Sequence, residues 1–355
     1  MTKDLYLIRS VMFIAGALVG LLFKNLGIPL PWVLGPMLST TILKLKYPAA
    51  VSLPRSIRDL FMIPLGYSIG VHVTPEACLS IASHISSIFL VTACIIVFCV
   101  LLALWTTRAT GISYASSVIG NMPGGLAPMI LVCDKIPRAD IGMVAVLQSV
   151  RLMMVIAAVP IILVYGGFGT PDVLNQRALP EISAALPFPV WLLVLAAVSG
   201  AFIFAKLNVT AAFFIGPIAS IALISLYTGV RLPEAPVWLV NVAQVFTGIY
   251  LGTYIDPVQL KRNRRLLPVC VIGAVLIVLA SMVIGYIASK TLNISLATAF
   301  LACAPGGVAE MCIIGMALGE DVPLILAYQL FRMLFVSFVM PCGLKWFFNR
   351  HAPTQ

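Results

Sequence analysis

Long apolar segments fill almost the whole of this chain, and most charged residues lie in the short stretches between them. Of the 355 residues, 61% are hydrophobic and 10% are charged, whereas a soluble domain is about 45–50% apolar and about 25% charged. A soluble fold of this composition would expose more apolar surface than water tolerates. The composition therefore excludes a soluble enzyme, a disordered regulator and a collagen-like fibre. It predicts an all-α polytopic membrane protein with room for about ten to twelve spans.

The net charge of +10 comes largely from basic loops. Four Lys and Arg residues lie in the loop 44–58, and four more lie in the stretch 261–265. Basic loops are typical of the cytoplasmic side of a membrane protein. The chain has no helix-turn-helix pattern and no soluble segment long enough for a reader domain, so we expect membrane lipid and not nucleic acid as a partner.

Metal and redox chemistry are not expected. The eight cysteines form no CxxC pair, and the three histidines lie in loops or at the C-terminus. Copper and non-haem iron sites usually need two or three converging imidazoles. We therefore expect no catalytic residues, no metal, no cofactor and no enzymatic activity.

The most informative pattern is an internal duplication. Five features recur in the same order at an offset of 181 or 182 residues, as 216 − 35 and 305 − 123 illustrate. The first copies are Leu34-Gly35-Pro36, Gly66-x-x-x-Gly70, Pro123-Gly124-Gly125, Asp140 and Gln148-x-x-Arg151; the second copies are Ile215-Gly216-Pro217, Gly248-x-x-x-Gly252, Pro305-Gly306-Gly307, Asp321 and Gln329-x-x-Arg332. This order predicts two repeat units at 8–165 and 188–346, joined by a linker at 166–187.

Each unit contains six apolar segments that are helix candidates. They are 9–24, 31–46, 57–72, 85–105, 113–134 and 141–165 in the first unit, and 188–205, 209–227, 237–254, 267–288, 296–318 and 323–348 in the second. The run from Val11 to Phe23 reads as a first span, because no small-residue cleavage pattern follows it.

The loop charges indicate that the two units are inverted relative to each other. The basic loop follows the second segment in the first unit but the third segment in the second unit, so equivalent loops favour opposite sides of the membrane. Inversion needs an odd number of spans per unit, and we expect the short segment 31–46 with its Gly35-Pro36 kink or turn to be the one that does not span. This gives ten spans with both termini outside; an eleven-span arrangement with the N-terminus inside stays open.

The fifth segment of each unit should be broken near the middle of the membrane. Proline removes an amide donor and clashes with the preceding turn, and paired glycines leave the backbone bare. Asn121, Pro123, Gly124 and Gly125 mark one break, and Pro305, Gly306 and Gly307 mark the other. The ends of broken helices carry partial charges and form solute sites in secondary transporters. The alternative is a pair of ligand-free loops between short helices.

Charged residues of three kinds lie in the same segments as these breaks or close to them in the sequence: a glutamate, two aspartates and two arginines. Glu310 has Pro128 as its counterpart, so this acid belongs to one unit alone, and it could take up a proton or bind a cation. A simpler interpretation is a loop carboxylate that reaches the interface. Asp140 and Asp321 are expected to cap the last helix of each unit.

Gln148 with Arg151, and Gln329 with Arg332, share helix faces at a spacing of three. Each arginine either neutralises the carbonyl end of the adjacent broken helix or holds an anionic group of a substrate. Gly66-x-x-x-Gly70 and its copy provide small faces for close helix packing.

Together, the LGP and IGP turns, the two PGG motifs and the paired Q-x-x-R motifs resemble the bacterial AbrB membrane protein family, over about residues 8–346. Members of that family are labelled as regulators of gene expression or as ammonia monooxygenases; the second label fits poorly without an imidazole cluster. The family is also similar to cation/proton antiporters and anion transporters. The resemblance implies an inverted five-plus-five bundle in which two broken helices cross.

We therefore expect a multi-pass protein of the bacterial inner membrane that transports a small solute by alternating access, with an anion as one candidate. Proton or sodium coupling and a homodimer are both compatible with the sequence. No adjacent Asp-Asp pair is present in the core, which disfavours a sodium/proton exchanger. The second hypothesis is a membrane-embedded regulator of gene expression that acts indirectly or through a partner.

Overall fold

The described part of the protein is helical throughout. The computed structural model describes residues 2–124, 126–133, 136, 139–168, 189–209, 211–230 and 232–344, and no strand occurs among them. The all-α class predicted from the composition is confirmed. The helices are α1 (Thr2–Asn25), α2 (Pro31–Lys46), α3 (Arg55–Gly70), α4 (Pro75–Ser83), α5 (Ile85–Thr110), α6 (Tyr114–Asn121), α7 (Leu126–Cys133), α8 (Ile141–Leu163), α10 (Val190–Lys206), α11 (Ala212–Thr228), α12 (Val237–Gly252), α13 (Pro257–Arg262), α14 (Leu267–Leu292), α15 (Leu296–Cys303), α16 (Val308–Leu318) and α17 (Val322–Leu334).

Three short helical elements complete the order of elements. They are η1 (Val164–Phe168), η2 (Arg264–Leu266) and η3 (Phe335–Val339). The predicted linker 166–187 falls almost wholly outside the described residues, which resume at Pro189.

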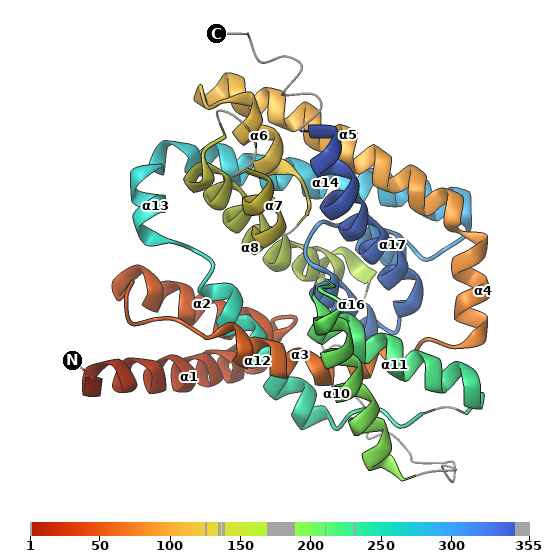
Figure 1. Ribbon diagram of the computed structural model, residues 1–355. Helices are drawn as coiled ribbons and strands as arrows, with labels where there is room; N and C mark the ends of the chain where they lie inside the picture. Colours follow the sequence, from red (N-terminus) through yellow and green to blue (C-terminus); the bar gives the residue numbers. More distant parts are fainter. Residues whose placement is uncertain are drawn as a thin grey trace. The chain divides into compact units, whose positions relative to one another are not determined.

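The helices group into two compact units (Figure 1). One unit comprises Met1–Ser83, Pro160–Tyr254 and Cys312–Leu324; the other comprises His84–Val159, Ile255–Met311 and Ile325–Gln355. Each compact unit therefore draws helices from both halves of the duplicated sequence. The two sequence repeats are not the two compact bodies, and the repeat boundaries stay a prediction from the sequence.

In the first compact unit, the glycine pairs of one repeat pack against the Gly-Pro helix of the other. A β-carbon on Gly66 would lie 2.5 Å from the carbonyl oxygen of Phe214 in α11, and one on Gly70 would lie 2.9 Å from that of Ile218. The reverse contact places Gly252 of α12 against the carbonyl oxygen of Met37 in α2, at 2.6 Å. These helices approach so closely that only glycine fits, as small-residue packing motifs allow.

The two Gly-Pro motifs lie inside continuous helices. α2 runs through Pro36 and α11 runs through Pro217 without interruption. Of the kink or turn that the sequence predicts at these motifs, the turn is therefore excluded, and the kink stays a prediction. Gly35 instead lets α2 approach α1, since a β-carbon there would lie 2.5 Å from the backbone nitrogen of Gly20. At about 1.5 Å per residue, the 16 residues of α2 are about 24 Å long, short of a typical hydrocarbon core.

In the second compact unit, the two longest helices present large apolar side chains outward. On α14, Leu279, Val283 and Ile287 are more than half exposed, and α5 exposes Phe89, Leu90 and Val97 in the same way. Exposed leucine, valine and phenylalanine side chains in this number are expected where helices contact the hydrocarbon core of a membrane.

Five helices among the described residues are long and apolar enough to cross a membrane. They are Ile8–Asn25, Ile85–Thr110, Ile141–Gly167, Arg264–Leu292 and Val322–Leu344. Other apolar helices, among them α10, α11 and α12, are shorter than these five. These lengths indicate a membrane protein, whereas the ten-span and eleven-span arrangements stay predictions.

Candidate functional site

Both fifth segments are broken where the sequence predicts. α6 ends at Asn121 and α7 begins at Leu126, while α15 ends at Cys303 and α16 begins at Val308. In both breaks a glycine amide donates to the carbonyl two residues earlier, from Gly124 to Met122 at 2.9 Å and from Gly306 to Ala304 at 3.0 Å. Gly125 lies outside the described residues.

Serine residues fix the start of each first half-helix, which the sequence analysis missed. The hydroxyl oxygen of Ser113 accepts from the amide of Ser116 at 3.1 Å, and that of Ser295 accepts from the amide of Thr298 at 3.0 Å. A serine directly before an apolar run is an ordinary N-cap signal. Both half-helices therefore begin at a serine N-cap, and both end shortly before a proline, Pro123 or Pro305.

In the first repeat, Gln148 and Arg151 of α8 close the carboxyl end of α6. The side-chain nitrogen of Gln148 donates to the carbonyls of Ile119 and Met122 at 2.8 and 2.9 Å. Nη1 of Arg151 donates to the carbonyls of Asn121 and Met122 at 2.8 and 3.0 Å. Nη2 of Arg151 donates to Oε1 of Gln148 at 2.6 Å, which holds the pair together.

The second repeat builds the same arrangement from α17 and α15. Gln329 donates to the carbonyls of Leu301 and Ala304 at 2.6 and 2.9 Å. Nη1 of Arg332 donates to the carbonyl of Cys303 at 3.0 Å, and Nη2 donates to Oε1 of Gln329. We call each such set, Gln148 with Arg151 or Gln329 with Arg332, a Gln-Arg clamp.

The clamps match the structural interpretation of the arginines. The last carbonyls of a helix carry a partial negative charge and lack partners within the helix. Arg151 and Arg332 are 6% and 4% exposed, so these charge-assisted hydrogen bonds lie away from water, where they are strongest. Nε of each arginine makes no hydrogen bond with the described residues, and it is the donor that each clamp leaves unused.

Each break also lies against the last helical segment of the other repeat. A β-carbon on Gly124 would lie 2.6 Å from Cγ1 of Val336 in η3, and one on Gly306 would lie 3.0 Å from Cγ1 of Val155 in α8. A β-carbon would also lie 2.6 Å from Cε of Met129 at Gly124 and 2.5 Å from Cε of Met311 at Gly306, so neither position has room for a side chain. Each break is thus packed against a helical segment of the other repeat, and the crossing of the two broken helices stays an expectation from the resemblance.

Glu310 lies in the first turn of α16 and is 7% exposed. The simple interpretation of a loop carboxylate at the interface is therefore wrong. Its carboxylate lies over the backbone of Gly307, whose φ of 96° and lack of side chain leave the space; a β-carbon there would collide with Oε2. A carboxylate at this position meets the positive end of the helix dipole.

Asn121 is buried and its amide already has partners. Its side-chain nitrogen donates to the carbonyl of Ser117 at 2.9 Å and to the hydroxyl of Thr106 at 3.3 Å.

The capping prediction for the aspartates is confirmed. Oδ1 of Asp140 accepts from the amide of Met143, and Oδ1 of Asp321 accepts from that of Leu324, both at 3.0 Å.

Comparison with known proteins places these motifs in a family. The family model described as "Transition state regulatory protein AbrB" matches residues 32–348. The chain is 26% identical to "Uncharacterized protein YhjN" of Bacillus subtilis strain 168, over 96% of this chain and 94% of the relative. It is 24% identical to "Putative regulator AbrB" of Escherichia coli K12, over 98% of both chains.

Proposed function

Because the chain belongs to the AbrB family of helical membrane proteins, we propose that it is a secondary transporter of a small anionic solute in the bacterial inner membrane. It would cross the membrane several times and work by alternating access. The observation that carries this proposal is the pair of helix breaks in one compact unit, in each of which a Gln-Arg clamp closes the end of the first half-helix. Broken helices of this kind form midplane solute sites in known transporter folds.

The charges around the breaks support an anionic solute. Arg151 and Arg332 bring two positive charges into this core, and Glu310 brings one negative charge. Charges away from water are costly unless they are compensated. The two Nε–H donors that the clamps leave unused add to this excess of positive and donating groups. An anion that enters near Pro123 and Pro305 would meet groups that favour it.

Reciprocal contacts support a two-fold relation between the repeats. Gly66 of the first repeat meets the helix that carries Pro217, and Gly252 of the second meets the helix that carries Pro36. Contacts in which each partner repeats the other's role are characteristic of a two-fold axis. Together with the opposite loop charges, they favour inverted repeats that rock about a shared site.

A regulator is the second candidate, because the Escherichia coli relative bears that name. In this chain a regulatory effect would be indirect, through the level of the transported solute or through a soluble partner. Loss of the protein would then change gene expression in either case, so expression data alone do not separate the two candidates.

Flux in proteoliposomes tests the proposal. Purified protein should accelerate the uptake of at least one anion from a panel of labelled mono- and dicarboxylates, phosphate and chloride. Protein-free vesicles and the Arg332→Met variant are the controls. A complete lack of flux across the panel, with a soluble protein co-purifying at fixed stoichiometry, would favour the regulator.

Glu310→Gln tests whether this carboxylate couples transport to protons. The variant keeps the shape and removes the titrating group, so we expect flux that no longer responds to external pH. Glu320→Gln, at a partly exposed position beyond the carboxyl end of α16, is the matched control. If the pH profile of flux is the same in Glu310→Gln and wild type, proton coupling at Glu310 is refuted while transport itself stands.

A further inference from the structure

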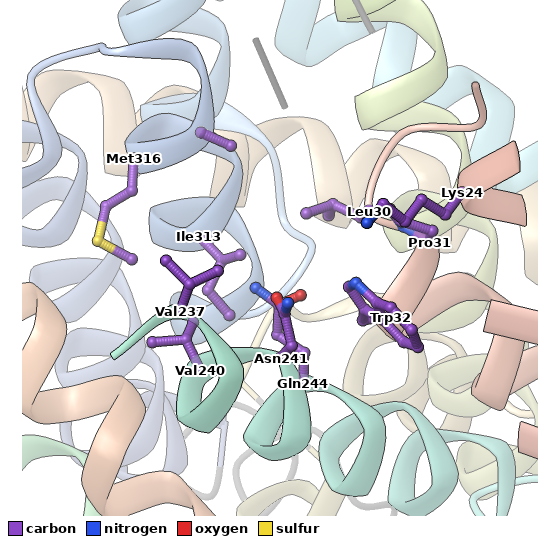
Figure 2. A pocket seen from close by; sticks show the side chains of 11 residues that line it. Lys24, Leu30, Pro31, Trp32, Val237, Val240, Asn241, Gln244, Ile313 and Met316 are labelled. Carbon is purple, nitrogen blue, oxygen red and sulfur yellow. The ribbon is translucent and has the colours of Figure 1, made fainter. Parts of the chain in front are cut away.

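A cavity lies within the first compact unit, in a part of the chain that the Gln-Arg clamps do not reach. Its volume is about 120 Å³, and it is lined from α12, from the C-terminal part of α16, and from the connection between α1 and α2. Figure 2 shows Asn241 and Gln244 rising from α12 toward the same space, with Trp32 to one side of them and Lys24 next to Leu30 and Pro31. None of these four side chains belongs to the Gln-Arg clamps.

The two amides in this cavity have no protein partner. Gln244 is 8% exposed, and neither it nor Asn241 makes a hydrogen bond with any residue that the structure describes. Both amides line the cavity, and a polar group that has no protein partner at such a place binds a ligand or ordered water. Because Asn241 and Gln244 are three residues apart on one helix, they present their amides to one spot.

The polar groups of the cavity are mainly donors. The indole of Trp32 and the ammonium of Lys24 can only donate, and each amide brings two N–H groups against one carbonyl oxygen. Lys24 forms no ion pair with the described residues, and no carboxylate lines the cavity. Such a set recognises a negatively charged acceptor with two oxygens.

The remaining lining is hydrocarbon. Val237, Val240 and Ile313 line the cavity together with these donors. A cavity of this volume is near the roughly 150 Å³ that holds a benzene molecule. We propose that this cavity binds a small monocarboxylate of about three to five carbons, with its carboxylate on the donors and its chain on the valines. Binding at this site is independent of whether the protein transports.

The other repeat does not offer the same set. By the offset of 182, Asn241 corresponds to Asp59 and Lys24 corresponds to Lys206. Asp59 already accepts from the neighbouring Arg58, whose guanidinium lies 4.6 Å from the ring centre of Tyr250. An unoccupied donor set is therefore a property of one repeat, which provides Lys206 as a matched control.

Ligand-observed NMR with labelled butyrate and purified protein in detergent micelles tests the proposal. We expect butyrate to bind, and butyramide, its neutral analogue, to bind at least about tenfold more weakly because it loses the charged hydrogen bonds. Inorganic phosphate should also bind at least about tenfold more weakly, because it leaves the apolar wall uncovered. Equal binding of butyramide or phosphate, or no binding of butyrate, overturns the proposal.

Variants locate the site. Lys24→Gln and Gln244→Leu should each weaken butyrate binding at least about tenfold, whereas Lys206→Gln should leave it unchanged. Lys24 is exposed on the helix end, so its variant keeps the test decisive even if Gln244→Leu does not fold. Wild-type affinity in Lys24→Gln overturns the site. Displacement of butyrate by a long-chain fatty acid at far lower concentration would show a lipid as the occupant and overturn the small-acid proposal.

Discussion

Arg151 and Arg332 show how single residues make broken helices possible inside an apolar bundle. Each guanidinium lies across the last carbonyls of a half-helix, and its second nitrogen holds a glutamine. That glutamine donates to one further carbonyl of the half-helix and to one that the arginine also contacts. Arginine suits this role because its planar fork presents donors in fixed directions and keeps its charge when buried. Lysine offers one point charge on a flexible chain, so the two residues are not interchangeable here.

Replacement of Arg151 by methionine should destabilise the protein strongly. The carbonyl oxygen of Asn121 and Oε1 of Gln148 would each lose a donor, and each unsatisfied buried group costs about 1–3 kcal/mol. We expect a loss of about 3 kcal/mol or more, measured as thermal or denaturant unfolding in detergent, with Arg151→Lys recovering only part of it. Arg262→Gln, on the exposed end of α13, is the control. Wild-type stability in Arg151→Met would contradict the clamp.

At the scale of the helices, close packing depends on a few glycines that face a backbone carbonyl oxygen of a neighbouring helix. Gly66, Gly70 and Gly252 each face a backbone carbonyl oxygen of the opposite repeat within 3 Å of where a β-carbon would be. Gly273 of α14 differs, since its nearest neighbour would be a side-chain carbon of Leu102 at 3.8 Å. The same residue type therefore has two different roles in helices of similar composition.

Alanine substitutions separate these two roles. Gly66→Ala should force α3 and α11 apart and lower stability, because a rigid backbone oxygen of Phe214 cannot move aside. Gly273→Ala should be neutral or should stabilise by about 0.5–1 kcal/mol, since it removes backbone entropy from the unfolded chain. Melting curves of both variants in one detergent check this. Equal melting temperatures for the two variants would refute the packing role of Gly66.

The sequence predicts much of these elements because their causes are local. Proline and glycine break helices by their own covalent structure, so Pro123 and Pro305 mark the breaks without tertiary information. Gln148 and Arg151 share a face by helical spacing alone. The turn at Gly35-Pro36 was misjudged because the same residues also serve close packing within a continuous helix. The cavity at Gln244 escaped prediction because its lining combines segments more than 200 residues apart, and a single sequence does not say which segments meet.

At the scale of the whole molecule, the duplication is visible in the connecting helices that occupy equivalent positions in the two repeats. α4 and α13 begin at Pro75 and Pro257, 182 residues apart. α4 carries Glu76 and no basic residue in its last turn, whereas α13 carries Lys261 and Arg262 there. The inversion that we propose would place only one of these two connections in the cytoplasm, and would account for one being basic and its counterpart not.

Reporter fusions or cysteine labelling in intact cells test this orientation. Probes in 72–84 and in 254–267 should report opposite sides of the membrane, with the basic 254–267 connection inside. A pair of probes within one connection, at its two ends, is the control for a single side. The same side for both connections would contradict the inversion of the repeats.

Solute counterflow tests the central claim most directly. Proteoliposomes preloaded with an unlabelled anion that scores in the flux panel are diluted into a trace of the labelled form. An alternating-access carrier must then accumulate label transiently above the external concentration, because the site returns to the outside loaded with unlabelled solute, which also competes with the label for exit. We predict this overshoot for the wild type and its loss in Arg332→Met. Labelled uptake that is unaffected by internal solute in every case would contradict a carrier built on two broken helices.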